Sequence, residues 1–168
     1  MIISKKKAWI GIGANLGQPK MQVMKAIECL HDSEYVSVDE ASSLYQTEPI
    51  GPQDQPNFIN MVVRVTTKLR PLEMLHRILE IEHQFGRTRD GSRNGPRRLD
   101  LDLLMLSDTV IRSPQLTLPH PRLKERLFVL APLMELEGDM EIPGLGCVSA
   151  FIKNCHGQGI IRLNHNAS

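Results

Sequence analysis

Two aspartates interrupt a leucine-rich run, R-R-L-D-L-D-L-L-M-L, at residues 97–106. If the run is a β-strand, successive side chains point to opposite faces, so Asp100 and Asp102 share one face and the leucines beside them share the other. Along a strand the two carboxylates would start about 6–7 Å apart. Like charges this close on a half-buried face repel and are costly to desolvate. The pattern therefore predicts a compensating cation, either arginine or a bound metal ion.

A cluster of arginines without lysine precedes these aspartates: Arg87, Arg89, Arg93, Arg97 and Arg98. Arginine stays charged and offers a planar fork of donors that matches phosphate oxygens, whereas lysine is a point charge. We interpret the segment as a phosphate clamp, because it leads directly into the two carboxylates. The alternatives are a solvated basic loop and an RNA-binding arm.

Arginines beside two close carboxylates match what a nucleoside triphosphate with magnesium needs. Mg²⁺ prefers one or two carboxylates together with phosphate oxygens and water. In phosphoryl transfer, bound cations neutralise the charge that develops. We therefore favour metal binding by Asp100 and Asp102 over the alternative, in which they only form ion pairs with Arg97 and Arg98.

A second candidate site lies in G-P-Q-D-Q-P-N-F-I-N, residues 51–60. Phe58 and Asn60 are two residues apart and share a face if the segment is extended. An aromatic plate beside an amide suits a flat heterocycle with hydrogen-bonding edges. An ordinary core role for Phe58 and a strand-end cap for Asn60 are equally compatible with the residue types. His120, in L-P-H-P-R, is more often structural, but next to a phosphate site it becomes a candidate ligand donor.

The elements that must position these residues follow from hydrophobic periodicity and from prolines and glycines. We expect strands at 7–13, 36–45, 58–67 and the aspartate run, and helices at 19–30, from Pro71 to Gly86, and at 127–136. The stripe of the second helix would be Leu72, Leu75, Ile78 and Leu79. Glu82 lies on the inward side of that helix, where it either meets an arginine or the nucleotide, or forms an intrahelical pair. We interpret G-I-G-A-N-L-G as a turn after the first strand, in which Asn15 is a candidate ligand donor.

The order β-α-β-β-α-β with a C-terminal helical piece predicts an α+β, ferredoxin-like fold. Its antiparallel sheet would carry helices on one face and leave the other free. The length of 168 residues suits a single domain over residues 1–168. The segment after Gly138 shows no informative pattern.

Composition excludes some classes of partner. The net charge of +1 argues against nucleic acid and anionic membranes as partners of the whole molecule. The three cysteines are odd in number and form no C-x-x-C pair, which fits a reducing compartment. No apolar run reaches the length of about 18 residues that spans a membrane. We expect a cytoplasmic monomer.

Four stretches, taken in order, carry a family resemblance: I-G-I-G-A-N-L-G, S-S-L-Y-Q-T-E-P-I-G-P-Q-D-Q-P-N-F-I-N, G-P-R-R-L-D-L-D-L-L-M and L-T-L-P-H-P-R-L-K-E-R-L-F-V-L-A-P-L. The chain resembles the 6-hydroxymethyl-7,8-dihydropterin pyrophosphokinases of folate biosynthesis, from about Trp9 to Leu136. The resemblance implies a ferredoxin-like fold. It also implies transfer of the pyrophosphoryl group of ATP to the pterin hydroxymethyl group, with release of AMP.

The resemblance also implies roles for individual residues. Asp100 and Asp102 would hold two Mg²⁺ ions. Catalysis would involve Arg87, Arg97 and Asp102. ATP would contact Glu82, Arg89, Arg93, Thr117, His120 and Arg126. The pterin would contact Thr47, Ile50, Phe58, Asn60 and Phe128, with the two phenylalanines on opposite faces of its ring. Three positions depart from the family pattern: Glu48, Asn94 and Pro121.

Two other functions stay open. An RNA-binding ferredoxin-like module could use the arginines, but such modules stack bases on sheet aromatics, and aromatic residues make up only 4% of this chain. A D-x-D sugar-nucleotide transferase would need both a nucleotide-binding fold and an acceptor site, for which the chain looks too short. Salt-dependent RNA binding without ATP turnover would favour the first. Better protection by a sugar nucleotide than by ATP would favour the second.

Overall fold

The computed structural model describes residues 4–31, 34–51, 53–86 and 98–163. The elements are β1 (Lys6–Ala14), α1 (Pro19–Leu30), β2 (Val36–Ala41), β3 (Tyr45–Thr47), β4 (Phe58–Thr67), α2 (Pro71–Gln84), β5 (Asp100–Leu106), β6 (Ile111–Arg112), β7 (Thr117–Leu118), the 3-10 helix η1 (Leu123–Glu125), α3 (Leu127–Glu137), β8 (Glu141–Ile142), β9 (Gly146–Cys147), α4 (Val148–Ile152) and β10 (Ile160–Arg162). The main sheet has the order β10-β3-β4-β1-β5, and β2 also pairs with β4.

The centre of the sheet is built from β4, β1 and β5, which pair antiparallel. Their register places Gly13 of β1 opposite Asn60 of β4 on one side and Asp100 of β5 on the other. This connectivity is the split βαβ arrangement expected from the sequence. The ferredoxin-like α+β fold is confirmed, and its register sets the two candidate sites on either side of one glycine.

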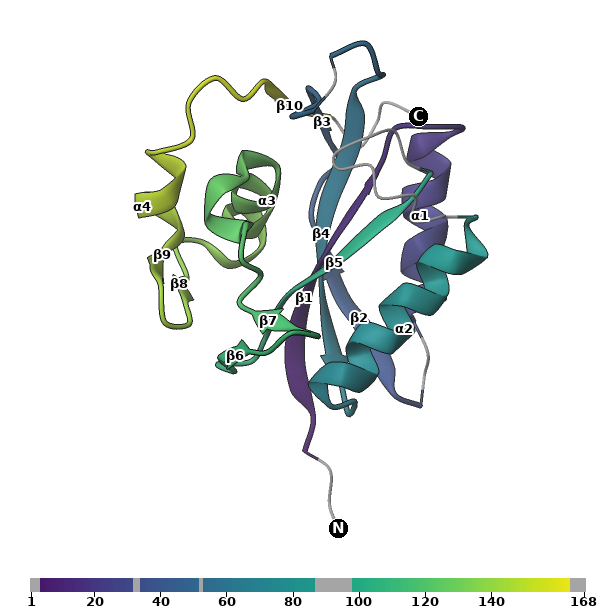
Figure 1. The fold of residues 1–168 in the computed structure, drawn as a ribbon, viewed down its shortest axis with the longest axis vertical. Helices are drawn as coiled ribbons and strands as arrows, with labels where there is room; N and C mark the ends of the chain where they lie inside the picture. The colour runs from purple at the N-terminus through teal and green to yellow at the C-terminus, as the bar shows by residue number, and fades with distance from the viewer. Residues whose placement is uncertain (1–3, 32–33, 52, 87–97, 164–168) are drawn as a thin grey trace.

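Both faces of the sheet are covered, so the expectation of a free face is wrong. Helices α1 and α2 lie against one face, and α3 and α4 lie on the other side (Figure 1). On that second side Trp9, Val62 and Leu104 of the sheet pack in one core with residues of α3. Helix α3 is apolar around much of its circumference, as L-F-V-L-A-P-L-M shows, and such a helix is stable only when it is buried.

Several local expectations hold and others change. The bounds of α1 and β4 are those predicted, and α2 ends just before Gly86, whose positive φ of 81° suits a helix C-terminus. The predicted strand at 36–45 is two strands, β2 and β3, both paired with β4. The predicted stripe of α2 is wrong at Leu72, which is exposed, because the buried face starts at Met74.

The glycine-rich segment after the first strand is not a simple turn. Gly11 and Gly13 lie within β1, and Gly17, with a φ of 71°, is the glycine that turns the chain toward α1. Asn15 is buried and donates hydrogen bonds to Gln55 and to the carbonyl of Pro56, so its amide joins β1 to the segment before β4.

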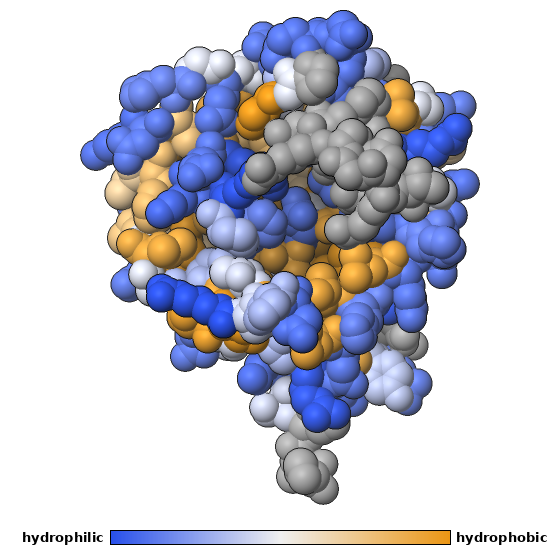
Figure 2. Space-filling view, viewed as in Figure 1, coloured by the Kyte–Doolittle hydropathy of each residue, from blue (hydrophilic) through white to orange (hydrophobic). Residues whose placement is uncertain are grey.

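The face of the molecule seen in Figure 2 is mostly polar. Blue residues cover most of the face in Figure 2, and orange residues form several small patches among them. None of the helices in the described ranges has both the length and the apolar composition needed to cross a membrane.

Candidate active site

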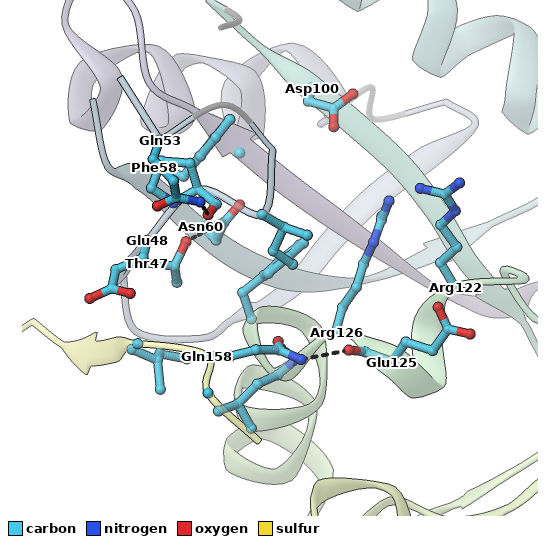
Figure 3. A pocket seen from close by; sticks show the side chains of 18 residues that line it. Thr47, Glu48, Gln53, Phe58, Asn60, Asp100, Arg122, Glu125, Arg126 and Gln158 are labelled. Carbon is cyan, nitrogen blue, oxygen red and sulfur yellow. Dashed lines mark hydrogen bonds between the residues drawn. The ribbon is translucent and has the colours of Figure 1, made fainter. Parts of the chain in front are cut away.

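A cavity of about 430 Å³ opens between the sheet, the N-terminus of α3 and the segment that leads into β10 (Figure 3). All five residues predicted to contact a pterin line it: Thr47, Ile50, Phe58, Asn60 and Phe128. Asp100 and Arg126 line the same cavity. Residues from the middle and the end of the chain thus meet at one end of the sheet.

The floor of the cavity holds a buried amide in a fixed orientation. The Nδ2 of Asn60 donates a hydrogen bond of 2.7 Å to the Oγ1 of Thr47 on β3. Gly13 lies beside it, and a Cβ at that position would stand 2.3 Å from the Oδ1 of Asn60. Because Asn60 bonds across to β3, it is not a strand-end cap. The missing side chain at Gly13 gives this amide its room.

Two phenylalanines line the cavity from different elements. Phe58 begins β4 and is half-buried at the cavity wall, while its neighbour Ile59 packs in the core beneath α1 and α2. Phe128 belongs to the first turn of α3, and the guanidinium of Arg126 lies 5.5 Å from the centre of its ring. This distance is within the range of a cation–π interaction. The cavity therefore offers aromatic surface from both the sheet and α3.

Asp102 lies beside an arginine and a histidine that the sequence did not pair with it. Its Oδ2 is 3.2 Å from Nη1 of Arg126, and its Oδ1 is 3.6 Å from Nε2 of His120. The Nδ1 of His120 accepts a hydrogen bond from the backbone N–H of Arg122. In the neutral imidazole this acceptor role places the proton on Nε2, the nitrogen that faces Asp102.

The arginines of the predicted clamp fall mostly outside the described residues: Arg87, Arg89, Arg93 and Arg97. Arg98 is described and exposed, and its backbone carbonyl accepts a hydrogen bond from Gln22 on α1. The structure thus shows Arg126, far along the chain, as a cation beside the aspartate strand.

Glu82 anchors the aspartate strand from the helix side. Its side chain is 2% exposed, and Oε2 accepts a hydrogen bond of 2.9 Å from the backbone N–H of Leu101. Leu101 lies between the two aspartates, so Glu82 holds the backbone that presents them. This contact across to β5 was part of neither interpretation of Glu82.

The segment after β5 contains two more residues that were predicted to contact ATP, Thr117 and His120. The backbone N–H of His120 donates to the carbonyl of Leu104, which holds the histidine beside β5. Thr117 lies in β7, opposite Arg112 of β6. Neither Thr117 nor His120 lines the cavity of Figure 3, so any role at a nucleotide would be outside that cavity.

The pair Asp100 and Asp102 fits a magnesium site. Both are partly exposed residues on one face of β5, and Asp100 opens into the cavity. No group of three or more His, Cys, Asp or Glu side chains within the described ranges could hold a metal ion. Mg²⁺ does not require such a cage, because it keeps several waters and takes phosphate oxygens of the substrate as ligands.

Sequence reasoning missed the contribution of the segment after Gly138. Residues 157–160 line the cavity, and β10 extends the sheet by pairing with β3. Arg122 and Gln53 also line the cavity without having been singled out. The only local signal was the short G-Q-G at 157–159, in which Gly157 has a φ of 71°. Such a tripeptide is too short to indicate a site by itself.

Comparison with known proteins identifies relatives of this chain. Residues 9–138 match the family model of 7,8-dihydro-6-hydroxymethylpterin-pyrophosphokinase (HPPK). The chain is 45% identical over 129 residues to a 2-amino-4-hydroxy-6-hydroxymethyldihydropteridine pyrophosphokinase of Bacillus subtilis. This match covers 77% of each of the two chains. It is 35% identical over 157 residues to the protein of that name from Haemophilus influenzae, covering 94% of this chain and 98% of the other.

A solved structure shares the fold. The crystal structure of Plasmodium falciparum HPPK-DHPS with pteroate superposes with a TM-score of 0.71 at 15% identity, over 92% of this chain. The chain spans 43% of the length of that protein. On the family match and the two bacterial relatives, the chain belongs to the 7,8-dihydro-6-hydroxymethylpterin-pyrophosphokinase family.

Proposed function

We propose that this chain transfers the pyrophosphoryl group of ATP to the hydroxymethyl group of 6-hydroxymethyl-7,8-dihydropterin, giving the pterin diphosphate and AMP in folate biosynthesis. One observation carries the proposal: a single cavity joins the aromatic and amide side chains of Phe58, Asn60 and Phe128 to the carboxylate of Asp100. A flat heterocycle bound at the first group would present its substituent to the second. Membership of the family supports the same reaction.

The pterin would bind in the part of the cavity near β3 and β4. Phe58 and Phe128 would pack on the two faces of its ring, and Ile50, which is exposed at the rim, would cover one edge. The amide of Asn60 would hydrogen-bond the polar edge. Its bond with Thr47 fixes the direction of that amide before the substrate arrives, so little ordering remains to be done on binding.

ATP would bind on the side of the aspartates. Asp100 and Asp102 would hold Mg²⁺, two ions by the family resemblance, and bound magnesium supplies charge neutralisation at the phosphates. Residues that would contact the nucleotide or its phosphates are Arg87, Arg89, Arg93, Arg97, Thr117, His120 and Arg126. Glu82 would act indirectly, because its carboxylate holds the backbone of Leu101 between the aspartates.

The reaction would be a single displacement at the β-phosphorus of ATP. The hydroxymethyl oxygen forms a bond to the β-phosphorus, and the bond from that phosphorus to the oxygen bridging the α- and β-phosphates breaks. AMP leaves with the bridging oxygen, and the hydroxyl proton is released. Asp102 is the candidate acceptor for this proton, although such a transfer depends mainly on positioning and on charge stabilisation.

The product nucleotide tests the proposal. The purified protein is mixed with Mg-ATP, with and without 6-hydroxymethyl-7,8-dihydropterin, and the nucleotide released is identified by ion-exchange chromatography. We expect AMP that depends on the pterin, with no free pyrophosphate. ADP would indicate ordinary kinase chemistry on this scaffold. No nucleotide product would contradict the proposal, and RNA binding that weakens with salt would then favour the RNA-binding alternative.

We further propose that the chain works as a monomer in the cytoplasm, without nucleic acid or membrane as partners. The near-neutral net charge of +1 and the three free cysteines support this proposal. Light scattering of the purified protein checks the oligomeric state, because a dimer would double the mass of 18.9 kDa.

A further inference from the structure

Gln158 connects the segment before β10 to the start of α3. Its Oε1 accepts a hydrogen bond of 2.9 Å from the backbone N–H of Leu127. Its Nε2 donates one of 2.9 Å to the carbonyl of Glu125, which Figure 3 shows as a dashed line. These two backbone groups belong to the peptide bonds on either side of Arg126. One side-chain amide thus holds the backbone of Arg126 from both sides.

The backbone of Arg126 needs such a partner. Arg126 separates η1 from α3 in an extended conformation, with φ −111° and ψ 105°, and precedes the first residue of α3. The first N–H groups of a helix have no partner within the helix, and an arginine side chain has no acceptor to offer them. No side-chain cap is present at this N-cap position. Gln158 therefore supplies, from 31 residues away, an acceptor that the local sequence lacks.

The side chain that this backbone carries reaches two parts of the candidate site. The guanidinium of Arg126 is 3.2 Å from Asp102 and lies over the ring of Phe128, which is two residues further along. A shift of the backbone at Arg126 would move both contacts together. The position of Gln158 therefore bears on the ion pair at the aspartate strand and on the aromatic wall of the cavity.

The segment that carries Gln158 is itself fixed to the opposite wall. Ile160 pairs with Thr47 of β3, and the backbone N–H of Glu48 donates to the carbonyl of Gly159. A Cβ at Gly159 would stand 2.5 Å from the carboxyl carbon of Glu48, so the two segments approach closely. Gln158 is thus placed by β3 and in turn places the start of α3.

We infer that Gln158 is a positioning residue for the reaction, acting through Arg126. Both ends of its amide bind backbone groups, so its effect on substrates passes through the residues that it holds. The effect on turnover that we expect from this inference rests on the proposed function. The inference also deepens that function, because it adds the segment after Gly138 to the site. Kinetic and spectroscopic measurements together separate this role from a general effect on stability.

The first test compares three single variants with the wild-type protein. Gln158→Ala removes both hydrogen bonds. Gln158→Glu keeps the shape of the side chain and its acceptor for the N–H of Leu127, but it has no N–H to donate to the carbonyl of Glu125. Gln115→Ala, at an exposed glutamine outside the cavity, is the matched control. Because a misplacement of about 1 Å can cost about a hundredfold, we expect kcat/KM for both substrates to fall between about tenfold and a hundredfold in both Gln158 variants. The control should equal the wild type.

A double variant identifies the route of the effect. If Gln158 acts through Arg126, Gln158→Ala should lower activity in the wild-type background and change little in the Arg126→Ala background. Losses that multiply in the double variant would overturn the inference, as would Gln158 variants with wild-type kinetics. A wild-type protein that releases no AMP would instead contradict the proposed function.

A spectroscopic readout tests the inference without turnover. The ¹⁵N resonance of the Arg126 Nε–H reports the environment of the guanidinium, which in the wild type is paired with Asp102. In Gln158→Ala we expect this resonance to move toward that of exposed arginines, and the amide of Leu127 to exchange its hydrogen faster. Unchanged resonance and exchange would overturn the inference whatever the activity of the protein.

Discussion

The replacement of Gly13 by alanine should separate substrate binding from folding. Gly13 and Gly11 lie two residues apart on β1 and face the same side of the sheet. A Cβ on Gly13 would stand 2.3 Å from the Oδ1 of Asn60, whereas a Cβ on Gly11 would stand 3.7 Å from the side chain of Leu104, an ordinary contact. Gly11→Ala is therefore a matched control for Gly13→Ala.

The size of the effect follows from these contacts. To regain an ordinary van der Waals distance, the Oδ1 of Asn60 must move by roughly 1 Å, and its amide then loses the bond of 2.7 Å to Thr47. Leaving that buried group unpaired costs about 1–3 kcal/mol of unfolding free energy. The smaller conformational freedom of alanine in the unfolded chain returns about 0.4–1 kcal/mol at both glycines. Misplacing a recognition group by about 1 Å costs about a hundredfold in kcat/KM.

The assay measures the two quantities on the same samples. Urea titration gives the free energy of unfolding, and pterin-dependent AMP release gives kcat/KM for the pterin. For Gly13→Ala we expect a modest loss of stability and a loss of about a hundredfold in kcat/KM. For Gly11→Ala we expect wild-type kinetics and equal or slightly higher stability.

Two results would refute the reasoning. Wild-type kinetics in Gly13→Ala would mean that the orientation of Asn60 does not matter for the pterin. An equal loss of activity in Gly11→Ala and Gly13→Ala would mean that any methyl group on β1 disturbs the site, whatever its distance from Asn60.

Three further outcomes are expected. Asp102→Asn should lower AMP release by at least about a hundredfold, the scale of one preorganised electrostatic group. The protein should stay folded, because the asparagine oxygen can still accept a hydrogen bond from Arg126 and the repulsion from Asp100 is relieved. Wild-type turnover with magnesium would contradict the metal assignment. Glu82→Ala should lower the free energy of unfolding by about 1–3 kcal/mol in urea titration, because the buried N–H of Leu101 loses its acceptor, and an unchanged midpoint would contradict this role. Burial, and then the hydrogen bond to Glu135 and its negative charge, raise the pKa of Tyr45 to about 12 from its ordinary value of 10. The stability that this tyrosine contributes is thus fully present below pH 10 and is lost as the pH rises toward 12. The difference in unfolding free energy between wild type and Tyr45→Phe should therefore shrink between pH 10 and 12. A constant difference would contradict the raised pKa of Tyr45.

Much of the fold was predictable because it depends on patterns between near neighbours. The alternation around Asp100 and Asp102 indicated β5, and Pro19 marked the first turn of α1. The second layer on the sheet was not predictable in this way. Apolar residues at Trp9 and Val62 fit either a free face or a covered one, and only the packing of α3 distinguishes the two.

The candidate site was likewise only partly predictable from the sequence. The types and spacing of Phe58, Asn60 and Asp100 indicated a flat ligand and a cation, and the fold brings all three to one cavity. The contact of Asp102 with Arg126 was not predictable, because Arg126 lies 24 residues further along the chain, among other charged residues, and no local pattern pairs it with the aspartate strand. The family resemblance placed Arg126 near the nucleotide but did not pair it with the carboxylate.

The sequence by itself determined the order of the central elements from β1 to β5, apart from the division into β2 and β3, the shared face of the two aspartates and the family to which the chain belongs. Those features depend on periodicity and on motifs that lie within short stretches of chain. Only the tertiary structure decided that Glu82 holds Leu101 and that Gln158 holds the backbone around Arg126. Such contacts join residues 19 and 31 positions apart, and their existence depends on how whole elements pack, which no local pattern of residue types encodes.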